Sequence, residues 1–256
     1  MNLKDTVTIV TGSATGVGAA AAIQIATKGG KVVINYTKSE AEAKETAAAC
    51  IKAGGDSIVV QGDVAEDAAC RRLAQAALDK WGRIDALINN AGTTKFVAGH
   101  DLDGLSADDF ARIFAVNVTG TFQMTRACAP AMRKQGRGAV VNVSSIASLQ
   151  GTGSSIAYAA SKGAINTLTK ALARNLGPEI KVNAVLPGMI DGRWLKAGYG
   201  AAYDGIKARY EKTTPLGKAA SPEQVAEVCV WLIEGGELVT GELITVDSGA
   251  HLGPVR

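Results

Sequence analysis

Residues 6–18 read Thr-Val-Thr-Ile-Val-Thr-Gly-Ser-Ala-Thr-Gly-Val-Gly, and this stretch decides the fold. Thr6–Val10 is a β-branched run typical of a buried strand, and the glycines after it open an Ala-rich segment with helical periodicity. Glycines let the backbone turn tightly and approach a phosphate closely, and the start of a helix presents unpaired N–H groups to an anion. The alternative is a Gly-rich turn without a ligand, but a strand before the turn and a helix after it favour a phosphate-binding loop. The loop has the spacing G-x3-G-x-G, and its predicted contacts are Gly12, Ser13, Thr15, Gly16, Val17 and Gly18.

The same strand-then-helix pattern repeats along the rest of the chain. Continuous apolar strands are typical of a parallel sheet that is covered on both faces, and alternating strands and helices predict right-handed crossovers. No linker or internal repeat divides the sequence, so we expect one Rossmann-type α/β domain over residues 1–256, with a doubly wound, parallel, seven-stranded sheet. After Thr6–Val10, the expected strands are Lys31–Ile34, Ser57–Val60, Ile84–Ile88, Ala139–Val143, Lys181–Val185 and Leu243–Val246.

Composition excludes several classes of protein. The chain is 47% hydrophobic and 20% charged, which is ordinary for a globular protein, and its net charge of +3 with no dense Lys/Arg block argues against a nucleic-acid partner. No apolar run approaches the length of a membrane-spanning helix, and the first residues lack the pattern of a secretory signal. The four cysteines are widely spaced without histidines at ligand spacing, which predicts free thiols, no metal site and a cytoplasmic location.

Polar residues follow the second strand, where sheets of this kind bind the adenosine ribose of a dinucleotide. A free ribose 2′-hydroxyl is usually held there by Asp or Glu, but this chain has Asn-Tyr-Thr-Lys-Ser at residues 35–39. The missing carboxylate and the cation of Lys38 favour a 2′-phosphate, so we expect NADP(H), with NAD(H) as the alternative. If Lys38 were only a surface lysine, and Ser39 only a helix cap, this preference would be lost. The predicted contacts are Asn35, Tyr36, Lys38 and Ser39.

Two further strands end in polar residues. Asp63-Val64 follows the third strand and Asn89-Asn90-Ala91-Gly92 follows the fourth. Ligands bind at the carboxyl ends of strands in open α/β sheets, so these residues are candidates for cofactor contacts. Asp63 as a helix cap, and the two asparagines as plain turn residues, are the alternatives.

Tyr158 and Lys162 stand four residues apart in a predicted helix, so their side chains share one helix face. A neighbouring cation favours the phenolate and lowers the pKa of a tyrosine. A tyrosine of this kind can exchange a proton with an alcohol near neutral pH. Such spacing also occurs on ordinary helix surfaces, so the pair gains meaning only from the phosphate loop and the polar strand ends.

Residues 189–215 interrupt the alternation of strands and helices. They contain Trp194 and three of the five tyrosines, at positions 199, 203 and 210. A lid over a pocket would have this composition, and so would a helical hairpin packed on a neighbouring subunit.

Together these motifs resemble the short-chain dehydrogenase/reductase family over the length Thr11–Asp247. Each motif is modest alone, but their joint order and spacing are highly specific. The matching positions are Thr11-x3-Gly16-x-Gly18, Asn89-Asn90-Ala91-Gly92, Asn117, Ser144-Ser145, Tyr158-x3-Lys162 and Pro187-Gly188.

The resemblance implies a catalytic role for four residues. Tyr158 would be the general acid in reduction or the base in oxidation, and Lys162 would lower its pKa and bind the nicotinamide ribose. Ser145 would hold the carbonyl oxygen of the substrate, with Ser144 as the weaker candidate. Asn117 would help hold a water that links Lys162 to solvent, or else satisfy backbone groups inside a helix.

The resemblance also implies contacts to the cofactor. Asp63 and Val64 would flank the adenine, while Asn89, Ala91 and Gly92 would line the ribose side. Pro187 and Gly188 would face the nicotinamide, and Ile190 would approach it through its backbone.

Three positions depart from the family pattern. Gly192 stands where many members have a threonine that bonds the carboxamide, and Asp247-Ser248-Gly249 replaces the usual Asp-Gly-Gly. Thr15 stands where NADP-preferring members often have a basic residue. These departures bear on the geometry of the lid, on assembly and on cofactor choice.

The resemblance implies a reductase of small-molecule ketones or an alcohol dehydrogenase. A 3-oxoacyl-thioester reductase is an alternative function with the same chemistry. A regulator that senses the cofactor without catalysing a reaction is an alternative from another class of protein. Enoyl reductases of related fold usually space their Tyr and Lys seven apart, which argues against that reaction. Members of the family are usually homotetramers or homodimers, here through the helix around Asn117–Arg133 and the helix of Tyr158.

Overall fold

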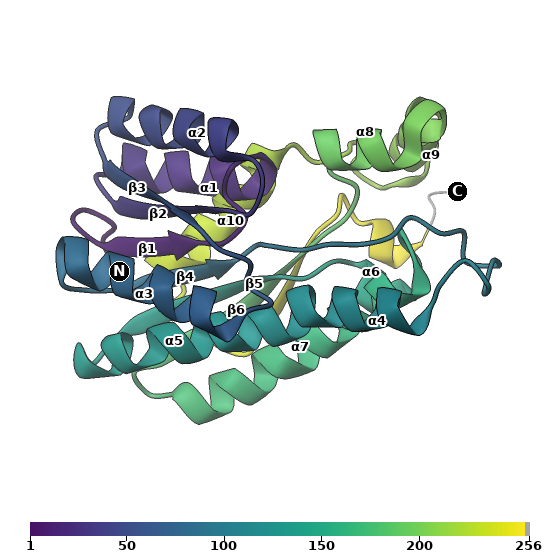
Figure 1. The fold of residues 1–256 in the computed structure, drawn as a ribbon. Helices are drawn as coiled ribbons and strands as arrows, with labels where there is room; N and C mark the ends of the chain where they lie inside the picture. Colours follow the sequence, from purple (N-terminus) through teal and green to yellow (C-terminus); the bar gives the residue numbers. More distant parts are fainter. Residues whose placement is uncertain (254–256) are drawn as a thin grey trace.

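A computed structural model describes residues 1–253 and contains one seven-stranded sheet in which all neighbouring strands are parallel (Figure 1). Each strand overlaps its predicted run, so the predicted doubly wound α/β fold with seven parallel strands is confirmed. The strands are β1 (Val7–Val10), β2 (Lys31–Tyr36), β3 (Asp56–Gln61), β4 (Ala86–Asn89), β5 (Gly138–Val143), β6 (Ile180–Pro187) and β7 (Leu243–Val246).

The order of the strands creates a switch point between β1 and β4. The sheet runs β3-β2-β1-β4-β5-β6-β7, so the chain winds outward from β1 through β2 and β3 and then returns to the other side of β1. At the carboxyl end of β1, Val10 stands opposite Ile34 of β2 and Ile88 of β4. Crossovers leave in opposite directions here, which opens a crevice suited to a ligand.

Helices cover both faces of the sheet (Figure 1). Successive side chains of a strand point to opposite faces, so in β1 Val7 and Ile9 join one apolar cluster and Val10 joins the other. One face is covered by α1 (Gly16–Thr27), α2 (Glu40–Lys52) and α10 (Pro222–Glu234), and the opposite face by α3 (Asp67–Trp81), α5 (Gly120–Lys134) and α7 (Ile156–Leu176).

Shorter helices lie at the ends of the sheet. They are α4 (Ala107–Phe114), the π-helix η1 (Ala115–Thr119), α6 (Ala147–Gln150), α8 (Arg193–Tyr199), the 3₁₀ turn η2 (Gly200–Ala202), α9 (Tyr203–Thr213) and the 3₁₀ turn η3 (Ala250–Leu252). The segment 189–215, which interrupts the sequence pattern, contains α8 and α9, and this helix pair stands apart from the two main layers (Figure 1).

β1 begins one residue later than its sequence pattern predicts, at Val7, and β4 begins two residues later. We expected a strand from Ile84, but β4 starts at Ala86. The Asp85 carboxylate explains the difference, because it accepts a hydrogen bond from the Val7 N–H at 2.9 Å and pairs with Arg83 at 2.6 Å. A side chain thus takes a donor that a continuing strand ladder would use.

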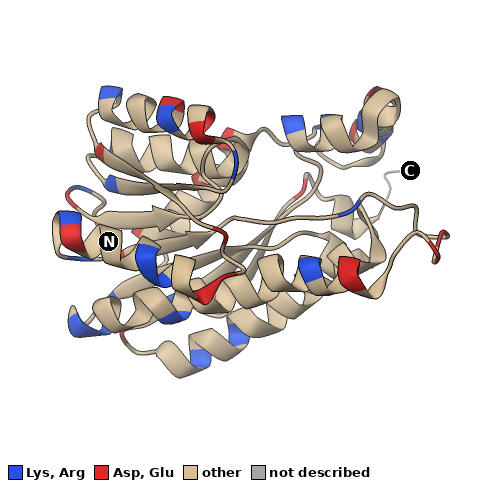
Figure 2. Ribbon diagram, viewed as in Figure 1, with Lys and Arg blue, Asp and Glu red and all other residues tan. Residues whose placement is uncertain are grey.

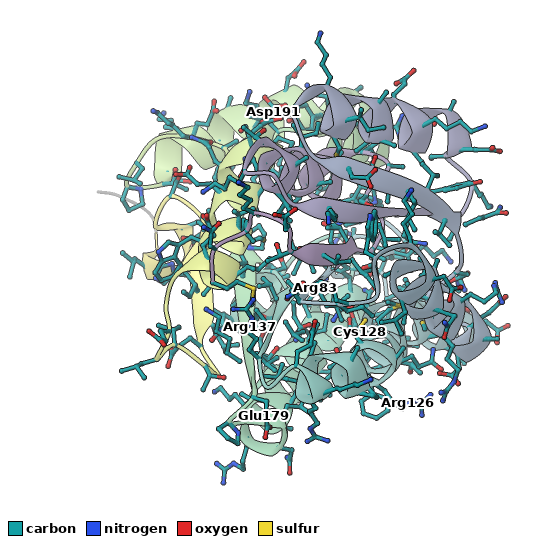
Figure 3. All side chains as sticks on the ribbon, turned by 90° about the vertical axis from the view of Figure 1, so that its left-hand side faces the viewer. Arg83, Arg126, Cys128, Arg137, Glu179 and Asp191 are labelled. Atoms are coloured by element: carbon teal, nitrogen blue, oxygen red, sulfur yellow. The ribbon has the colours of Figure 1, made fainter. Side chains whose placement is uncertain are left out.

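Charged residues of both signs are spread over the outer helices and loops (Figure 2). Within residues 1–253, no helix is both long enough and apolar enough to cross a membrane. All four cysteines are buried free thiols, with Cys128 in the α5 layer (Figure 3), and burial raises the pKa of each thiol.

Candidate active site

A cavity of about 1020 Å³ opens along the carboxyl ends of the strands. Segments far apart in the sequence meet on its wall: the loop after β1, the ends of β2 to β6, the start of α7 and the α8–α9 pair. Of the predicted site residues, those that line it are Gly12, Thr15, Gly16, Val17, Asn35, Lys38, Asp63, Val64, Ala91, Gly92, Ser144, Ser145, Tyr158, Lys162, Pro187, Gly188 and Ile190.

The loop after β1 has the geometry of a phosphate cradle. Gly16 has a φ of +62°, and no atom lies within 4 Å of the position that a Cβ would take, so its backbone faces open space. Gly18 is packed tightly instead, because a Cβ there would lie 2.6 Å from Asn90 Nδ2. Thr15 precedes α1 without capping its N–H groups by a side-chain bond. Open space over an uncapped helix start fits a pyrophosphate.

Ser13 and Asn35 shape this loop from beneath. The fully buried Ser13 hydroxyl donates to the Val10 carbonyl at 2.7 Å and accepts from the Asn35 N–H at 2.9 Å. The Asn35 side chain accepts from the Gly12 N–H at 3.0 Å and donates to the Gly62 carbonyl at 3.0 Å. Ser13 therefore supports the loop, whereas Asn35 both supports it and borders the cavity.

The end of β2 presents Lys38 to the cavity. Lys38 is exposed and lines the cavity together with Thr37, while Tyr36 and Ser39 do not line it. Ser39 occupies the N-cap position of α2 but makes no side-chain cap bond. The geometry therefore leaves one cation, Lys38, available beside the start of α2.

Asp63 is held by two donors rather than capping a helix. It accepts a hydrogen bond from the Ala65 N–H at 3.0 Å and pairs with Arg112 at 2.7 Å, whereas the N-cap of α3 is Glu66. Partial burial opposes ionisation, but the Ala65 N–H and the Arg112 guanidinium outweigh it and lower the pKa of Asp63. Arg112 also lines the cavity, although no sequence motif marks it as a site residue.

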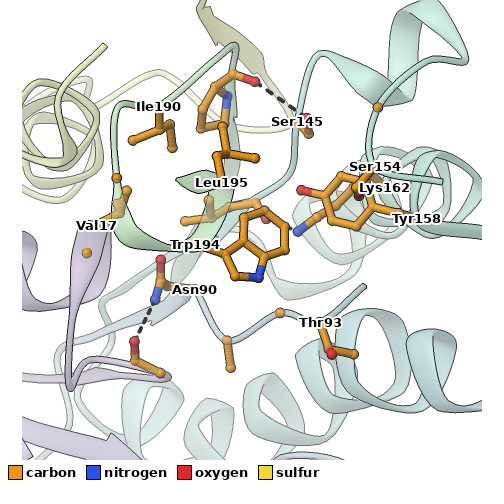
Figure 4. A pocket seen from close by; sticks show the side chains of 18 of the residues that line it. Val17, Asn90, Thr93, Ser145, Ser154, Tyr158, Lys162, Ile190, Trp194 and Leu195 are labelled. Atoms are coloured by element: carbon orange, nitrogen blue, oxygen red, sulfur yellow. Dashed lines mark hydrogen bonds between the residues drawn. The ribbon is translucent and has the colours of Figure 1, made fainter. Parts of the chain in front are cut away.

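The two asparagines after β4 have different surroundings. Asn89 is buried and donates to Asn142 Oδ1 at 2.9 Å and Thr125 Oγ1 at 3.2 Å, which ties β4 to β5 and α5. Asn90 donates to the carbonyls of Thr11 and Gly12 at 2.9 and 3.0 Å and lines the cavity (Figure 4). Asn89 is thus part of the sheet's own polar network, and Asn90 fixes the phosphate loop.

Tyr158 and Lys162 do share one helix face, and both line the cavity (Figure 4). Ser155 caps α7 by accepting from the Tyr158 N–H at 3.2 Å, which places Tyr158 in the first turn. The Lys162 ammonium lies 5.5 Å from the centre of the Tyr158 ring and donates to the Val143 carbonyl at 2.7 Å. The carbonyl of β5 therefore holds the ammonium beneath the phenol.

Burial shifts the pKa of both groups. It raises the pKa of Tyr158 to about 12, against a smaller lowering by a hydrogen bond with Ser145, and it lowers the pKa of Lys162 to about 8. The direction for Tyr158 is opposite to the lowering that we expected from the neighbouring cation. The physical reason is that removing the phenol from water disfavours the phenolate, and this outweighs the lowering by Ser145.

Ser145 and Ser144 point to different surroundings. The Ser145 hydroxyl accepts from the Ala147 N–H at 3.1 Å and lies 3.5 Å from the Pro187 carbonyl, at the cavity wall (Figure 4). Ser144 is buried and donates to Asn166 Oδ1 at 2.7 Å. Both serines line the cavity, but the Ser144 hydroxyl is bonded to Asn166, whereas Ser145 is the serine whose hydrogen bonding lowers the pKa of Tyr158.

Asn117 is fully buried in the π-helix η1 and does not line the cavity. Its side chain accepts from the Thr93 N–H at 2.8 Å, and it donates to the Thr93 carbonyl and to Ser161 Oγ, both at 3.0 Å. Ser161 in turn donates to the Tyr158 carbonyl at 2.7 Å. A π turn widens a helix locally and is frequent at functional sites, but its presence cannot be read from the residue pattern.

Backbone and side-chain contacts hold the segment after β6 in place beside the cavity. Ile190 pairs with Ala220, and a Cβ on Gly188 would lie 2.2 Å from the Tyr210 hydroxyl, which itself donates to the Asp247 carbonyl at 2.6 Å. Gly192, which replaces the family threonine, lines the cavity without a side chain. The departure at Gly192 therefore lies on the cavity wall, whereas the departing Ser248 does not line the cavity.

The α8–α9 pair forms the outer wall beside Tyr158. Asp191 ties the pair together through Tyr203 at 2.7 Å and Lys196 at 3.0 Å, and also contacts Lys207 (Figure 3). These donors, of which Lys207 is the strongest, hold the pKa of Asp191 far below its usual range. Trp194 of α8 lines the cavity next to Tyr158 (Figure 4).

Metal-ligating side chains do not gather at this site. Within the described part of the chain, no group of three or more His, Cys, Asp and Glu residues is placed to hold a metal ion.

Known proteins resemble this chain over nearly its whole length. A family model described as "Enoyl-(Acyl carrier protein) reductase" matches residues 12–251. The granaticin polyketide synthase putative ketoacyl reductase 2 of Streptomyces violaceoruber is 40% identical over 96% of both chains, and an uncharacterized oxidoreductase of Methylorubrum extorquens is 35% identical over 97% of this chain and 99% of its own. The crystal structure of a putative short-chain dehydrogenase/reductase from Burkholderia xenovorans superimposes with a TM-score of 0.91 at 41% identity, covering 97% of this chain and 99% of the other. The phosphate loop at the switch point, the Tyr158–Lys162 pair and these likenesses place the chain in the short-chain dehydrogenase/reductase family of oxidoreductases.

Proposed function

We propose that this protein interconverts a ketone and a secondary alcohol, with NADP(H) as the hydride carrier. One observation carries the proposal: Ser145, Tyr158 and Lys162 lie on the wall of the same cavity that the phosphate loop borders. A dinucleotide held by that loop would therefore reach the proton-transferring tyrosine within one cavity. When bound, the cofactor supplies or accepts the hydride, and the protein supplies binding, orientation and the proton.

Tyr158 is the proton donor in the direction of reduction. With a pKa of about 12 the phenol is protonated near neutral pH, so its O–H is available to the carbonyl oxygen as negative charge develops there. Ser145 offers a second hydroxyl to the same oxygen. The phenolate left behind is stabilised by Lys162, which has a pKa of about 8 and is mostly a cation at pH 7.

Asn117 is a positioning residue in this proposal. It touches Thr93 on one side and Ser161 on the other, and Ser161 stands between Tyr158 and Lys162 on α7. Its amide thus fixes the helix turn that aims the phenol and the ammonium. We also propose that Asn117 helps to hold a water molecule that links Lys162 to solvent.

The cofactor preference rests on Lys38. The cation lies on the cavity wall beside Thr37, and no Asp or Glu stands at residues 35–39 to hold a free ribose 2′-hydroxyl. These features favour the 2′-phosphate of NADP(H), and NAD(H) is the alternative. In this proposal, Thr15 and the Asp63–Arg112 ion pair line the part of the cavity that would hold the adenosine of the cofactor.

A 3-oxoacyl thioester is the second candidate substrate. It is favoured by the relative from Streptomyces violaceoruber, which is named as a putative ketoacyl reductase. The four-residue spacing of Tyr158 and Lys162 favours either carbonyl reduction over the enoyl reduction that the family model's description mentions.

A cofactor-oxidation assay tests the proposal. NADPH absorbance would be followed with a panel of ketones and 3-oxoacyl thioesters, using the wild type, Tyr158→Phe and the control Ser57→Ala, whose hydroxyl bonds the Ala47 carbonyl away from the cavity wall. We expect Tyr158→Phe to lower kcat by at least about 100-fold, because a general acid contributes about 10²- to 10⁴-fold, while the Kd for NADPH stays within about threefold. Full activity in Tyr158→Phe would disprove the mechanism, and tight NADPH binding without turnover of any carbonyl would support a regulator instead.

A further inference from the structure

Three aromatic rings are built into one wall beside Tyr158. Trp194 lies with its ring centre 5.8 Å from that of Tyr158 and 5.8 Å from that of Phe96, and Phe96 contacts Tyr199 at 5.1 Å. Both contacts of Phe96 are edge-to-face, the geometry that the charge distribution of aromatic rings prefers. The three rings come from the loop after β4, from α8 and from the end of α8, so only the fold assembles them.

The wall is held in place by its packing. The Phe96 ring lies so close to Gly198 of α8 that a Cβ on Gly198 would come within 2.0 Å of it. The Asp191 carboxylate ties α8 to α9 through Lys196 and Tyr203. These contacts hold α8 in place, and the Trp194 ring lies tilted against Tyr158 at 52° and against Phe96 at 64°.

Trp194 nevertheless remains 47% exposed while it lines the cavity (Figure 4). An indole is among the largest apolar surfaces that a side chain offers, and covering it with an apolar ring stabilises a complex through burial and through ring–ring contact. An uncovered indole beside the proposed proton donor is thus a surface for a flat substrate.

The wall around Trp194 holds one charged side chain, and that side chain is already paired with a carboxylate. Among the lining residues at 145–158 and 189–210, the one charged side chain is Arg193. It is paired with Glu42 of α2 at 3.0 Å, on the cofactor side of the cavity. The others are apolar, hydroxyl or amide side chains, or glycine. The Lys162 ammonium is itself committed to the Val143 carbonyl.

We propose that the substrate is an uncharged ketone that carries a flat aromatic ring system beside its carbonyl, with the ring lying against Trp194. This inference rests on the function proposed above and names its substrate class. Trp194 is then the residue that determines specificity, acting on the substrate body while Tyr158 and Ser145 act on its oxygen.

The test compares two ketones that share a carbon skeleton but differ in whether the ring system is flat and aromatic. The probes are 1-(2-naphthyl)propan-2-one and its saturated analogue 1-(decalin-2-yl)propan-2-one, in which a methylene separates the ring from the carbonyl and keeps the carbonyls equally reactive. The variants are Trp194→Ala, the conservative Trp194→Phe, and Trp231→Ala as a matched control, since Trp231 on α10 is also 47% exposed but does not line the cavity.

We expect the wild type to prefer the naphthyl ketone about tenfold in kcat/KM. Trp194→Ala should remove most of this preference through a higher KM with little change in kcat, Trp194→Phe should keep most of it, and Trp231→Ala should leave it unchanged. Equal kcat/KM values for the two ketones in the wild type, or equal losses for both ketones in Trp194→Ala, would overturn the inference.

A binding measurement separates this inference from the proposed function. Calorimetry in the presence of NADPH would record binding of each ketone without turnover. Trp194-dependent binding of the naphthyl ketone without reduction would support the aromatic site and contradict the proposed reaction. Reduction of other ketones, with the naphthyl ketone neither bound nor reduced, would leave the reaction standing and overturn the aromatic site.

Discussion

Folding strongly alters the electrostatics of Lys162. Its side chain is 4% exposed, and burial lowers its pKa from 10.5 to about 8. The ammonium is retained at neutral pH with one hydrogen bond, to the Val143 carbonyl. A buried cation lowers the stability of the fold, because its charge is removed from water. Beside a phenol it favours catalysis, because it stabilises the phenolate after proton transfer.

The lowered pKa predicts how stability depends on pH. The unfolded chain keeps Lys162 charged up to pH 10.5, whereas the folded protein releases the proton near pH 8. Burying the charged Lys162 therefore lowers the free energy of unfolding by its full amount below pH 8. This loss disappears as the pH rises toward 10.5. Relative to Lys162→Met, the wild type should gain about 2 kcal/mol in free energy of unfolding between pH 7.5 and 9.5. Urea unfolding at both pH values measures this, and parallel pH profiles for the two proteins would contradict it.

The position of Lys38 on the cavity wall leads to a prediction about cofactor preference. Lys38→Ala should weaken NADPH binding by roughly tenfold and NADH binding by much less, because the ammonium would bond the 2′-phosphate that NADH lacks. Calorimetric Kd values for both cofactors measure the difference. The control is Lys52→Ala, an exposed lysine at the far end of α2. An equal effect of Lys38→Ala on both cofactors would remove the reason for preferring NADP(H).

At the scale of elements, α8 is the part whose position decides the shape of the cavity. Three attachments hold it: the Phe96 ring against Gly198, the Asp191 bonds to α9, and the Arg193–Glu42 ion pair to α2. The ion pair is exposed and therefore weak on its own. The packing of Phe96 on Gly198 is the attachment that a single methyl group would disturb.

Gly198→Ala tests this attachment. In an ordinary helix this change stabilises by roughly 0.5–1 kcal/mol, and Gly205→Ala on α9, where no atom lies within 4 Å of the Cβ position, should show that gain. At Gly198 the Cβ must displace Phe96 or α8, so we expect no gain in thermal stability and a higher KM for the ketone substrate. A gain equal to that of Gly205→Ala, with KM unchanged, would mean that Phe96 does not position α8.

At the scale of the whole molecule, α5 and α7 leave a groove on the outside. The groove has a volume of about 270 Å³, and its apolar lining includes Phe122, Pro130 and Leu172. Phe122 is 41% exposed, with the Arg126 guanidinium 5.4 Å above its ring (Figure 3 labels Arg126). We propose that these two helices pack across subunits in a homotetramer or homodimer, as the family resemblance implies.

Phe122→Asp should therefore yield smaller particles than the wild type, since a carboxylate would be buried without a partner in such an interface. Light scattering after size-exclusion chromatography gives the mass. The control is Ile51→Asp on α2, at a site that is 58% exposed. An identical mass for Phe122→Asp and the wild type would show that the groove is not a subunit contact.

The sequence predicted the fold because the relevant signals are local. The β-branched runs and the glycines at Gly12, Gly16 and Gly18 act within a few residues, and parallel connectivity follows from their alternation with helices. The start of β4 lies two residues after its predicted position. The reason is that the Asp85 carboxylate takes the N–H of Val7, a residue far away in the chain. Distant contacts of this kind leave no periodic signal.

By itself, the sequence determined the sheet, the phosphate loop and the helix face that Tyr158 shares with Lys162, because each depends on neighbours one to five residues apart. The tertiary structure alone decided the direction of the Tyr158 pKa, the support roles of Ser13 and Asn89, and the aromatic wall of Phe96, Trp194 and Tyr199. Those properties depend on burial and on contacts between segments that only the folded chain brings together.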